Sequence, residues 1–338
     1  IIQSQQFIAV KIIKGANKVT DSKEEDWIHA ELAKKKLPHI MPFLDSMETG
    51  EGEQRRFFQF MPLGLGNGSD FHAMLAAADD EAHKSLLLHD AARQLIECLI
   101  RVHQEGVMHL DIKPDNLVYF VDGRWCLVDF GCAQRSYNGQ IEHDKGDTRY
   151  YAPERLAAAR AQNLGKKPCF DGRQADAFAA GLVLLTWQVG HYPLDKYVDG
   201  ATRIQNWDSE YFKTALHQYP ALQSPEPGSL WAVIRGLLAP NPEHRLSLKA
   251  ALQTTALKKN HFSQDFGREA VYRSLHAKLN TAIATPSSVK AKLTAPLRLF
   301  SMPSSNNSGV ALSEMDSSPS AIRKKHYYNN TNKQLEDD

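Results

Sequence analysis

The chain has 338 residues, enough for more than one folded unit, since domains commonly run to about 100–200 residues. Its 40 Lys and Arg residues are balanced by 39 Asp and Glu residues, and a net charge of +1 excludes the strongly basic composition typical of nucleic-acid-binding proteins. No apolar stretch approaches the roughly 20 residues that a membrane span needs. Four cysteines without metal-ligand spacing favour free thiols in a reducing, intracellular compartment.

The first predicted element is a strand over residues 7–13, Phe-Ile-Ala-Val-Lys-Ile-Ile, which is apolar and β-branched except for Lys11. A lysine in such a run ordinarily extends its ammonium group to water. A helix is predicted over residues 24–36, because the segment is acidic at its start and basic at its end, as the helix dipole favours. Glu31 lies in this helix, with Glu24 and Glu25 as alternatives for any role that one carboxylate would fill.

A second buried strand is predicted at residues 56–63, Arg-Phe-Phe-Gln-Phe-Met-Pro-Leu, and it contains Gln59 and Met61. The glycines at 64–69 follow it. A phosphate-binding loop would lie between two strands before Lys11 or between a strand and a helix N-terminus. The glycines at 64–69 occupy neither position. We interpret 64–69 as a flexible connector between two parts of the molecule.

The most informative residues lie in two short segments, His-Leu-Asp-Ile-Lys-Pro-Asp-Asn-Leu at 109–117 and Leu-Val-Asp-Phe-Gly at 127–131. Together they contain Asp111, Lys113, Asn116 and Asp129. Transfer of a phosphoryl group to a hydroxyl requires divalent metal, cationic contacts and an aligned acceptor, and these side chains can supply all three. The alternative is a structural one: a Pro-Asp-Asn turn and an ordinary turn at a strand end.

The two segments resemble the catalytic loop and the metal loop of eukaryotic-type protein kinases, H-R-D-x-K-x-x-N and D-F-G. The resemblance implies an α+β fold of two lobes, a small β-rich lobe that is incomplete at its N-terminus and a large, mainly helical lobe. It also implies ATP and Mg²⁺ as cofactors. Asp111 would be the catalytic base, Lys113 would contact the transferred phosphate, and Asn116 and Asp129 would hold the metal.

The same resemblance assigns residues to the nucleotide. Lys11 would contact the α- and β-phosphates and Glu31 would orient it, while the backbone of Gln59 and Met61 would hydrogen-bond the adenine. No glycine-rich hairpin precedes Lys11 in this sequence. We therefore expect an uncovered strand edge and weak nucleotide binding for the chain as given.

Downstream residues continue the resemblance. The sequence Gly-Asp-Thr-Arg-Tyr-Tyr-Ala-Pro-Glu at 146–154 is similar to the end of a kinase activation segment, and 176–181 is similar to the helix that supports the catalytic loop. Residues 237–245 resemble a late motif whose arginine, Arg245, would pair with Glu154 in the interior. Such a pair is costly to break from one side.

Leu110 is a departure from the family pattern, which usually has an arginine there to bind a phosphate on the activation segment. The absence of this arginine implies that the activation segment is not ordered by phosphorylation in the usual way. Arg135 and Arg149 are alternative cations for a phosphorylated Thr148. A carboxylate of the activation segment could also take the place of a phosphate, and the candidates are Glu142, Asp144 and Asp147.

Lys113 also indicates the substrate, since kinases that act on Ser or Thr of proteins carry a lysine two residues after the catalytic aspartate. The Gly-Asp-x-Arg-Tyr pattern at 146–150 occurs among relatives of Wee-type kinases as well, so dual or tyrosine specificity stays open. A pseudokinase or scaffold without turnover is the main alternative. A small-molecule or lipid kinase is disfavoured, because 146–154 resembles a peptide-docking platform.

The resulting organisation is a partial small lobe at 1–62, a large lobe at 63–262 and a mostly disordered tail at 263–338, with a helix near 266–279. The tail is rich in Ser, Asn and Pro. Its basic run at 323–326 fits either a nuclear localisation signal or solvated charge, so a cytoplasmic or a nuclear location is expected.

Overall fold

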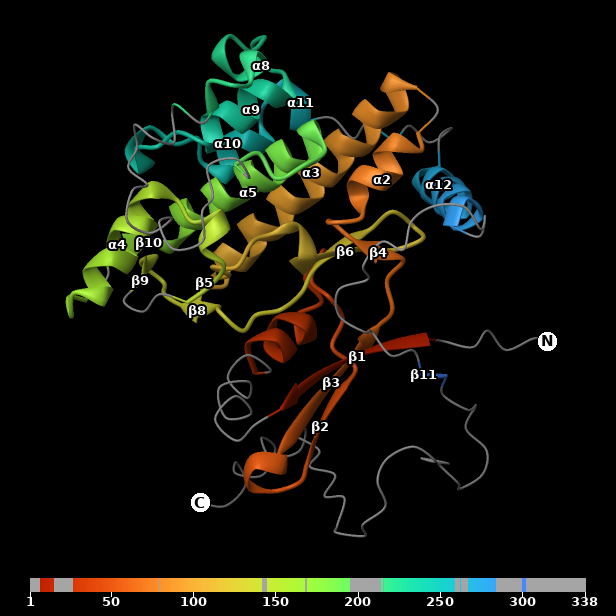
Figure 1. Ribbon diagram of the computed structural model, residues 1–338, viewed down its shortest axis with the longest axis vertical. Helices are drawn as coiled ribbons and strands as arrows, with labels where there is room; N and C mark the ends of the chain where they lie inside the picture. The colour runs from red at the N-terminus through yellow and green to blue at the C-terminus, as the bar shows by residue number, and fades with distance from the viewer. Residues whose placement is uncertain are drawn as a thin grey trace, which may run out of the picture. The chain divides into compact units, whose positions relative to one another are not determined.

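The structure is a computed structural model, shown in Figure 1. It describes residues 7–14, 27–78, 80–141, 145–167, 169–194, 214, 216–258, 262, 267–283 and 300–301. The chain divides into two compact units, the first from 1–27, 42–63 and 293–338, the second from 28–41 and 64–292. Glu24, Glu25, the basic run at 323–326 and nearly all of the tail beyond residue 283 lie outside the described residues.

The described residues of the first unit form an antiparallel sheet in the order β11-β1-β3-β2. Both strands predicted around Lys11 and Gln59 are confirmed, and these two residues are direct partners in the register of β1 and β3. Met61 lies opposite Ala9 in the same pair. The strands are β1 (Phe7–Lys14), β2 (Asp45–Thr49), β3 (Arg56–Pro62) and β11 (Phe300–Ser301), with the short 3₁₀ helix η1 (Gly52–Gln54) between β2 and β3.

The outer edge of β1 is paired at its first two residues, where we expected an uncovered strand edge. Phe7 pairs with Ser301 and Ile8 pairs with Phe300, so β11 lies along the first two residues of β1. Hydrogen bonding between strand edges is independent of sequence distance. A segment almost 300 residues away therefore occupies a position that the local sequence could not reveal.

The second unit is mainly helical, and with the sheet of the first unit it gives the predicted α+β class. None of the helices in the described ranges is both long enough and apolar enough to cross a membrane. The helices are residues 27–34, α2 (Phe71–Ala76), α3 (Glu81–Gln104), α4 (Pro153–Asn163), α5 (Gly172–Val189), α8 (Pro220–Gln223), α9 (Leu230–Leu237), α10 (Leu248–Leu252), α11 (Thr255–Lys258) and α12 (Arg268–Ile283).

Short strands and 3₁₀ turns connect these helices near the middle of the chain. The strands are β4 (Gly66–Asn67), β5 (Val107–Met108), β6 (Leu117–Tyr119), β7 (Trp125–Leu127), β8 (Gln134–Arg135), β9 (Gln140–Ile141) and β10 (Phe170–Asp171). The turns are η2 (Pro114–Asn116), η3 (Thr148–Tyr150) and η5 (Pro242–His244). The strands pair antiparallel as β4-β6-β7, β5-β8 and β9-β10. β6 and β7 form a hairpin, whereas the other pairs bring together separate loops of the unit.

The core of this unit is built on α5, which packs side by side with α3 on one side and with α9 on another (Figure 1). Most of α5 is buried, as expected for a helix that is apolar on nearly all faces. The helix begins after Asp171, whose side chain accepts from the Arg173 amide, and it ends at Gly190 in the left-handed conformation. These end signals fix the position of Asp176 in the second turn of the helix.

Helix α12 corrects the predicted start of the tail. The helix expected near 266–279 is present, but Tyr272 and Leu275 are buried in the core of the second unit. The indole Nε1 of Trp125 donates to the Tyr272 hydroxyl at 2.9 Å, and Arg268 pairs with the buried Asp90 at 2.6 Å. The large lobe therefore extends beyond residue 262, because partners distant in sequence bury one face of this helix.

The segment at 64–69 also differs from the flexible connector that we expected. Strand β4 pairs with β6, and the Gly68 amide donates to the carbonyl oxygens of Pro114 at 2.9 Å and Leu117 at 2.7 Å. A Cβ atom on Gly68 would lie 2.7 Å from the Pro114 oxygen. Glycine is needed here because two backbones approach closely, and the segment is thereby held against the loop that contains Asp111.

Candidate active site

The loop that carries Asp111 lies between β5 and β6 and is attached to α5 through Asp176. The amides of His109 and Leu110 each donate to the Asp176 carboxylate at 2.8 Å, and the His103 ring lies at the same distance. Burial alone favours the neutral carboxyl, but the hydrogen bond and charge of His103, together with the hydrogen bond from the His109 amide, hold the pKa of Asp176 below its usual value. An ionised, buried carboxylate thus supports the loop, as the sequence of 176–181 predicted.

Leu110 has a backbone φ of +62°, which is rare for a residue with a branched side chain. Such a conformation costs on the order of 1–3 kcal/mol and persists only where the surroundings impose it. Asp176 binds its amide, and Nη1 of Arg155 donates to its carbonyl oxygen at 2.7 Å. The Leu110 side chain is buried in an apolar cluster with Ile141 and Phe170. Apolar packing therefore occupies the position that the H-R-D-x-K-x-x-N pattern gives to an arginine.

Asp111 is almost fully buried, and both of its carboxylate oxygens accept hydrogen bonds. Oδ1 accepts from the Asp147 amide at 3.0 Å, while Oδ2 accepts from Asn116 Nδ2 at 2.9 Å and lies 2.8 Å from Lys113 Nζ. Burial opposes the charged form of Lys113, but Asp111 first, and then Asp147 and Asp129, raise its pKa. Lys113 is therefore an ammonium group in direct contact with a carboxylate.

Asn116 and Asp129 are brought together by the hairpin of β6 and β7. The Val128 amide donates to the Asn116 carbonyl oxygen at 3.0 Å, which holds the two loop ends together. Asp129 is the next residue along the chain, and its backbone φ is +64°. Because Nδ2 of Asn116 donates to Asp111, the amide oxygen is the atom with which Asn116 would hold a metal. Among the described residues no three or more His, Cys, Asp or Glu side chains gather to hold a metal. Two oxygen donors fit Mg²⁺ that also takes ligands from water and phosphates.

Phe130 packs between the loop of Asp111 and the helix over residues 27–34. Its ring lies edge-on to His109 at 4.9 Å between centroids and stacks on His29 at 5.3 Å. His29 is itself held by a hydrogen bond to the Met41 carbonyl at 2.7 Å. Burial lowers the pKa of His109, so this ring is neutral near physiological pH. The position of the metal loop is therefore linked to the helix that contains Glu31.

Glu31 forms an ion pair that the sequence did not predict. Its carboxylate contacts Nη2 of Arg135 in β8 at 2.6 Å and lies 3.8 Å from Lys35 Nζ. Lys11, the partner expected from the family resemblance, belongs to the other unit, as do Gln59 and Met61. The nucleotide contacts assigned to these residues remain predictions.

The sequence also missed Arg155, whose guanidinium is buried beside Leu110. Arg155 and the half-buried Arg160 lie on the same helix, α4, and both follow Ala-Pro-Glu in an Ala-rich run. Nothing in the local pattern separates them. Only the position of the helix against the loop of Asp111 assigns the buried role to Arg155.

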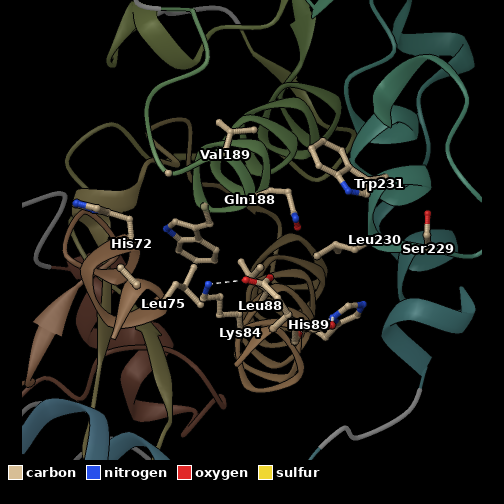
Figure 2. A pocket seen from close by; sticks show the side chains of 15 residues that line it. His72, Leu75, Lys84, Leu88, His89, Gln188, Val189, Ser229, Leu230 and Trp231 are labelled. Atoms are coloured by element: carbon tan, nitrogen blue, oxygen red, sulfur yellow. Dashed lines mark hydrogen bonds and ion pairs between the residues drawn. The ribbon is translucent and has the colours of Figure 1, made fainter. Parts of the chain in front are cut away.

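A separate pocket lies among α2, α3, α5 and α9 (Figure 2). Its wall combines apolar side chains such as Leu88 and Trp231 with the Lys84–Glu81 ion pair, whose atoms are 2.6 Å apart. Asp111, Lys113, Asn116 and Asp129 are not among the residues that line it. This pocket is therefore distinct from the group of side chains that the sequence predicted as catalytic.

Comparison with known proteins identifies the family. A model of the protein kinase domain matches residues 2–257. CBL-interacting serine/threonine-protein kinase 7 of Arabidopsis thaliana is 28% identical over 286 residues, which cover 79% of this chain and 58% of the relative. CBL-interacting serine/threonine-protein kinase 5 of the same plant is 32% identical over 185 residues, 52% of this chain and 38% of the relative.

A fungal relative is also similar. Serine/threonine-protein kinase CHK1 of Mycosarcoma maydis is 28% identical over 195 residues, which cover 56% of this chain and 27% of the relative. The chain thus spans about half the length, or less, of these curated relatives. The domain match includes both the loop of Asp111 and the loop of Asp129. The chain therefore belongs to the protein kinase family.

Proposed function

We propose that this chain transfers the γ-phosphate of ATP to serine or threonine hydroxyls of proteins. The observation that carries the proposal is the environment of Asp111, a buried carboxylate held by Asn116, Lys113 and the Asp147 amide. A carboxylate fixed by three donors is aligned before substrate arrives, which is the main contribution a protein makes to phosphoryl transfer.

Each residue then has a separate task. Asp111 accepts or orients the proton of the substrate hydroxyl, and the Lys113 ammonium lies beside it to neutralise charge on the transferred phosphate. Asn116 and Asp129 would hold Mg²⁺, which when bound neutralises the phosphate oxygens. Lys11, with Glu31, would bind the α- and β-phosphates, and the backbone of β3 at Gln59 and Met61 would bind the adenine.

The hydroxyl specificity is testable directly. Lys113 and the names of the relatives favour Ser and Thr, whereas the Gly-Asp-Thr-Arg-Tyr sequence at 146–150 leaves tyrosine as the alternative. Incubation with radiolabelled ATP, Mg²⁺ and peptides that differ only in a Ser, Thr or Tyr acceptor, followed by phosphoamino-acid analysis, should label Ser and Thr. Label confined to tyrosine would overturn the substrate assignment. Nucleotide binding without any label would indicate a scaffold.

We further expect turnover to be independent of phosphorylation at Ser136, Tyr137 and Thr148. A phosphate orders a loop only where cationic partners are placed to receive it. Leu110 is buried among apolar side chains and offers no charge. Arg135 pairs with Glu31. Nε of Arg149 donates to both carboxylate oxygens of Asp147 at 3.0 Å. Each alternative cation therefore already has a carboxylate partner, and the alternative carboxylates Glu142 and Asp144 lie outside the described residues.

The test is the triple variant Ser136→Ala, Tyr137→Phe and Thr148→Ala, compared with the parent by kcat on one peptide. We expect kcat to stay within about threefold of the parent, since such a change alters the barrier by less than about 1 kcal/mol. A loss of tenfold or more with an unchanged melting temperature would mean that phosphorylation of this segment controls the enzyme.

A further inference from the structure

Arg155 connects two segments that are far apart in the sequence. Its side chain is buried, with 2% of the residue exposed. Nη1 donates to the carbonyl oxygen of Leu110 at 2.7 Å, and Nη2 donates to the carbonyl oxygen of Lys145 at 2.6 Å. One guanidinium on α4 therefore binds the loop of Asp111 and the end of the activation segment at the same time.

Both of these carbonyl groups lie next to the contacts that fix Asp111. Leu110 directly precedes Asp111 and has the left-handed backbone described above, with its amide on Asp176. Lys145 precedes Gly146 and Asp147, and the Asp147 amide donates to Oδ1 of Asp111 at 3.0 Å. Arg155 thus holds the backbone on the N-terminal side of Asp111 and also the segment that binds its carboxylate.

The surroundings of Arg155 leave little freedom for either segment. The guanidinium lies over the ring of Tyr151, 3.7 Å from its centroid. A Cβ atom on Gly146, whose φ is +145°, would lie 2.6 Å from the Leu110 oxygen and 2.8 Å from Nη2 of Arg155. The segments approach so closely that a planar group with several directed N–H donors is required, and a lysine ammonium does not provide that geometry.

We propose that Arg155 is a positioning residue for phosphoryl transfer, which aligns Asp111 by binding the catalytic loop and the activation segment together without a phosphate. The proposal rests on the proposed kinase function. Leu110 brings no charge to this place, and Arg155 supplies a cation to the same two segments from another element, α4. The connection is built from a side chain and two backbone carbonyl groups, so it is present in the unmodified chain.

The test compares Arg155→Met, Arg155→Lys and Arg160→Met in the full chain. Arg155→Met keeps the length of the side chain and removes its donors, so we expect kcat to fall about tenfold to 100-fold, as small displacements of a catalytic group do. KM for ATP should change less than about twofold, because Lys11, Gln59 and Met61, which we assign to the nucleotide, belong to the first unit and Arg155 belongs to the second. Arg155→Lys should recover only part of the loss, and Arg160→Met should match the parent.

Hydrogen exchange supplies a readout that does not depend on activity. In Arg155→Met the amides of Leu110 and Asp147 should exchange faster than in the parent, while the amides of α5 keep their rates. Equal exchange at Leu110 and Asp147, or equal kcat per folded molecule, would overturn the role of Arg155. If Arg155→Met does not fold, kcat and the exchange rates of Arg155→Lys are compared with those of the parent instead. A parent without phosphate transfer would refute the kinase proposal, and the exchange rates would still decide whether Arg155 holds these segments.

Discussion

Replacing Asp111 by Asn is expected to reduce phosphate transfer by roughly 10²–10⁴-fold, the usual contribution of a general acid or base. Asn has nearly the same shape but neither the charge nor the basicity of the carboxylate that accepts from Asn116 and the Asp147 amide. Asp129→Asn should have an effect at least as large, because it removes the only charged ligand that we assign to the metal. Neither change removes apolar packing, so the fold should persist.

Radiolabelled ATP with a generic Ser/Thr protein substrate measures the effect, and thermal unfolding checks the fold. Asp115→Asn is the matched control. Asp115 lies in the same loop, is exposed, and accepts a hydrogen bond from Ser69 Oγ at 3.1 Å. It should retain transfer close to that of the parent. Undiminished transfer by Asp111→Asn or Asp129→Asn would refute the roles that we give these two carboxylates.

The largest effect on stability is expected for Arg245→Met, at about 3–5 kcal/mol of unfolding free energy, because one partner of a buried ion pair is left without the other. The Arg245 side chain is fully buried. It donates to Glu154 Oε2 at 2.9 Å, to the Gln174 carbonyl at 2.9 Å and to the Ala239 carbonyl at 3.0 Å. The variant leaves all of these acceptors without their donor.

Urea unfolding of Arg245→Met and of Arg273→Met separates a buried pair from a surface pair. Arg273 pairs with Glu269 one turn away on α12, and more than half of each side chain is exposed. A helical surface pair contributes only about 0.2–0.5 kcal/mol. Glu154→Gln combined with Arg245→Met should cost less than the sum of the single changes, since the two residues act as one pair. A loss below about 1 kcal/mol for Arg245→Met would contradict this account.

The sequence alone determined the candidate catalytic group, because its members are close along the chain. Asp111, Lys113 and Asn116 occupy one loop, and Asp129 follows a hairpin in which Leu117 pairs with Leu127. Short-range geometry of this kind follows from local residue pattern. The strands around Lys11 and Gln59 were predictable for the same reason, since their apolar runs carry the pattern of a buried sheet.

Tertiary structure decided which charged residues are partners. The pairing of Arg245 with Glu154 was expected from the family resemblance and is confirmed, but Glu31 contacts Arg135, which no local pattern indicates. The burial of Arg155 and the packing of Tyr272 against Trp125 were equally invisible in the sequence. A side chain is buried or exposed according to which distant segment covers it, and that is a property of the fold rather than of neighbouring residues. The sequence therefore predicted the candidate catalytic groups of this member of the protein kinase family, and the packing of distant segments decided how those side chains are held.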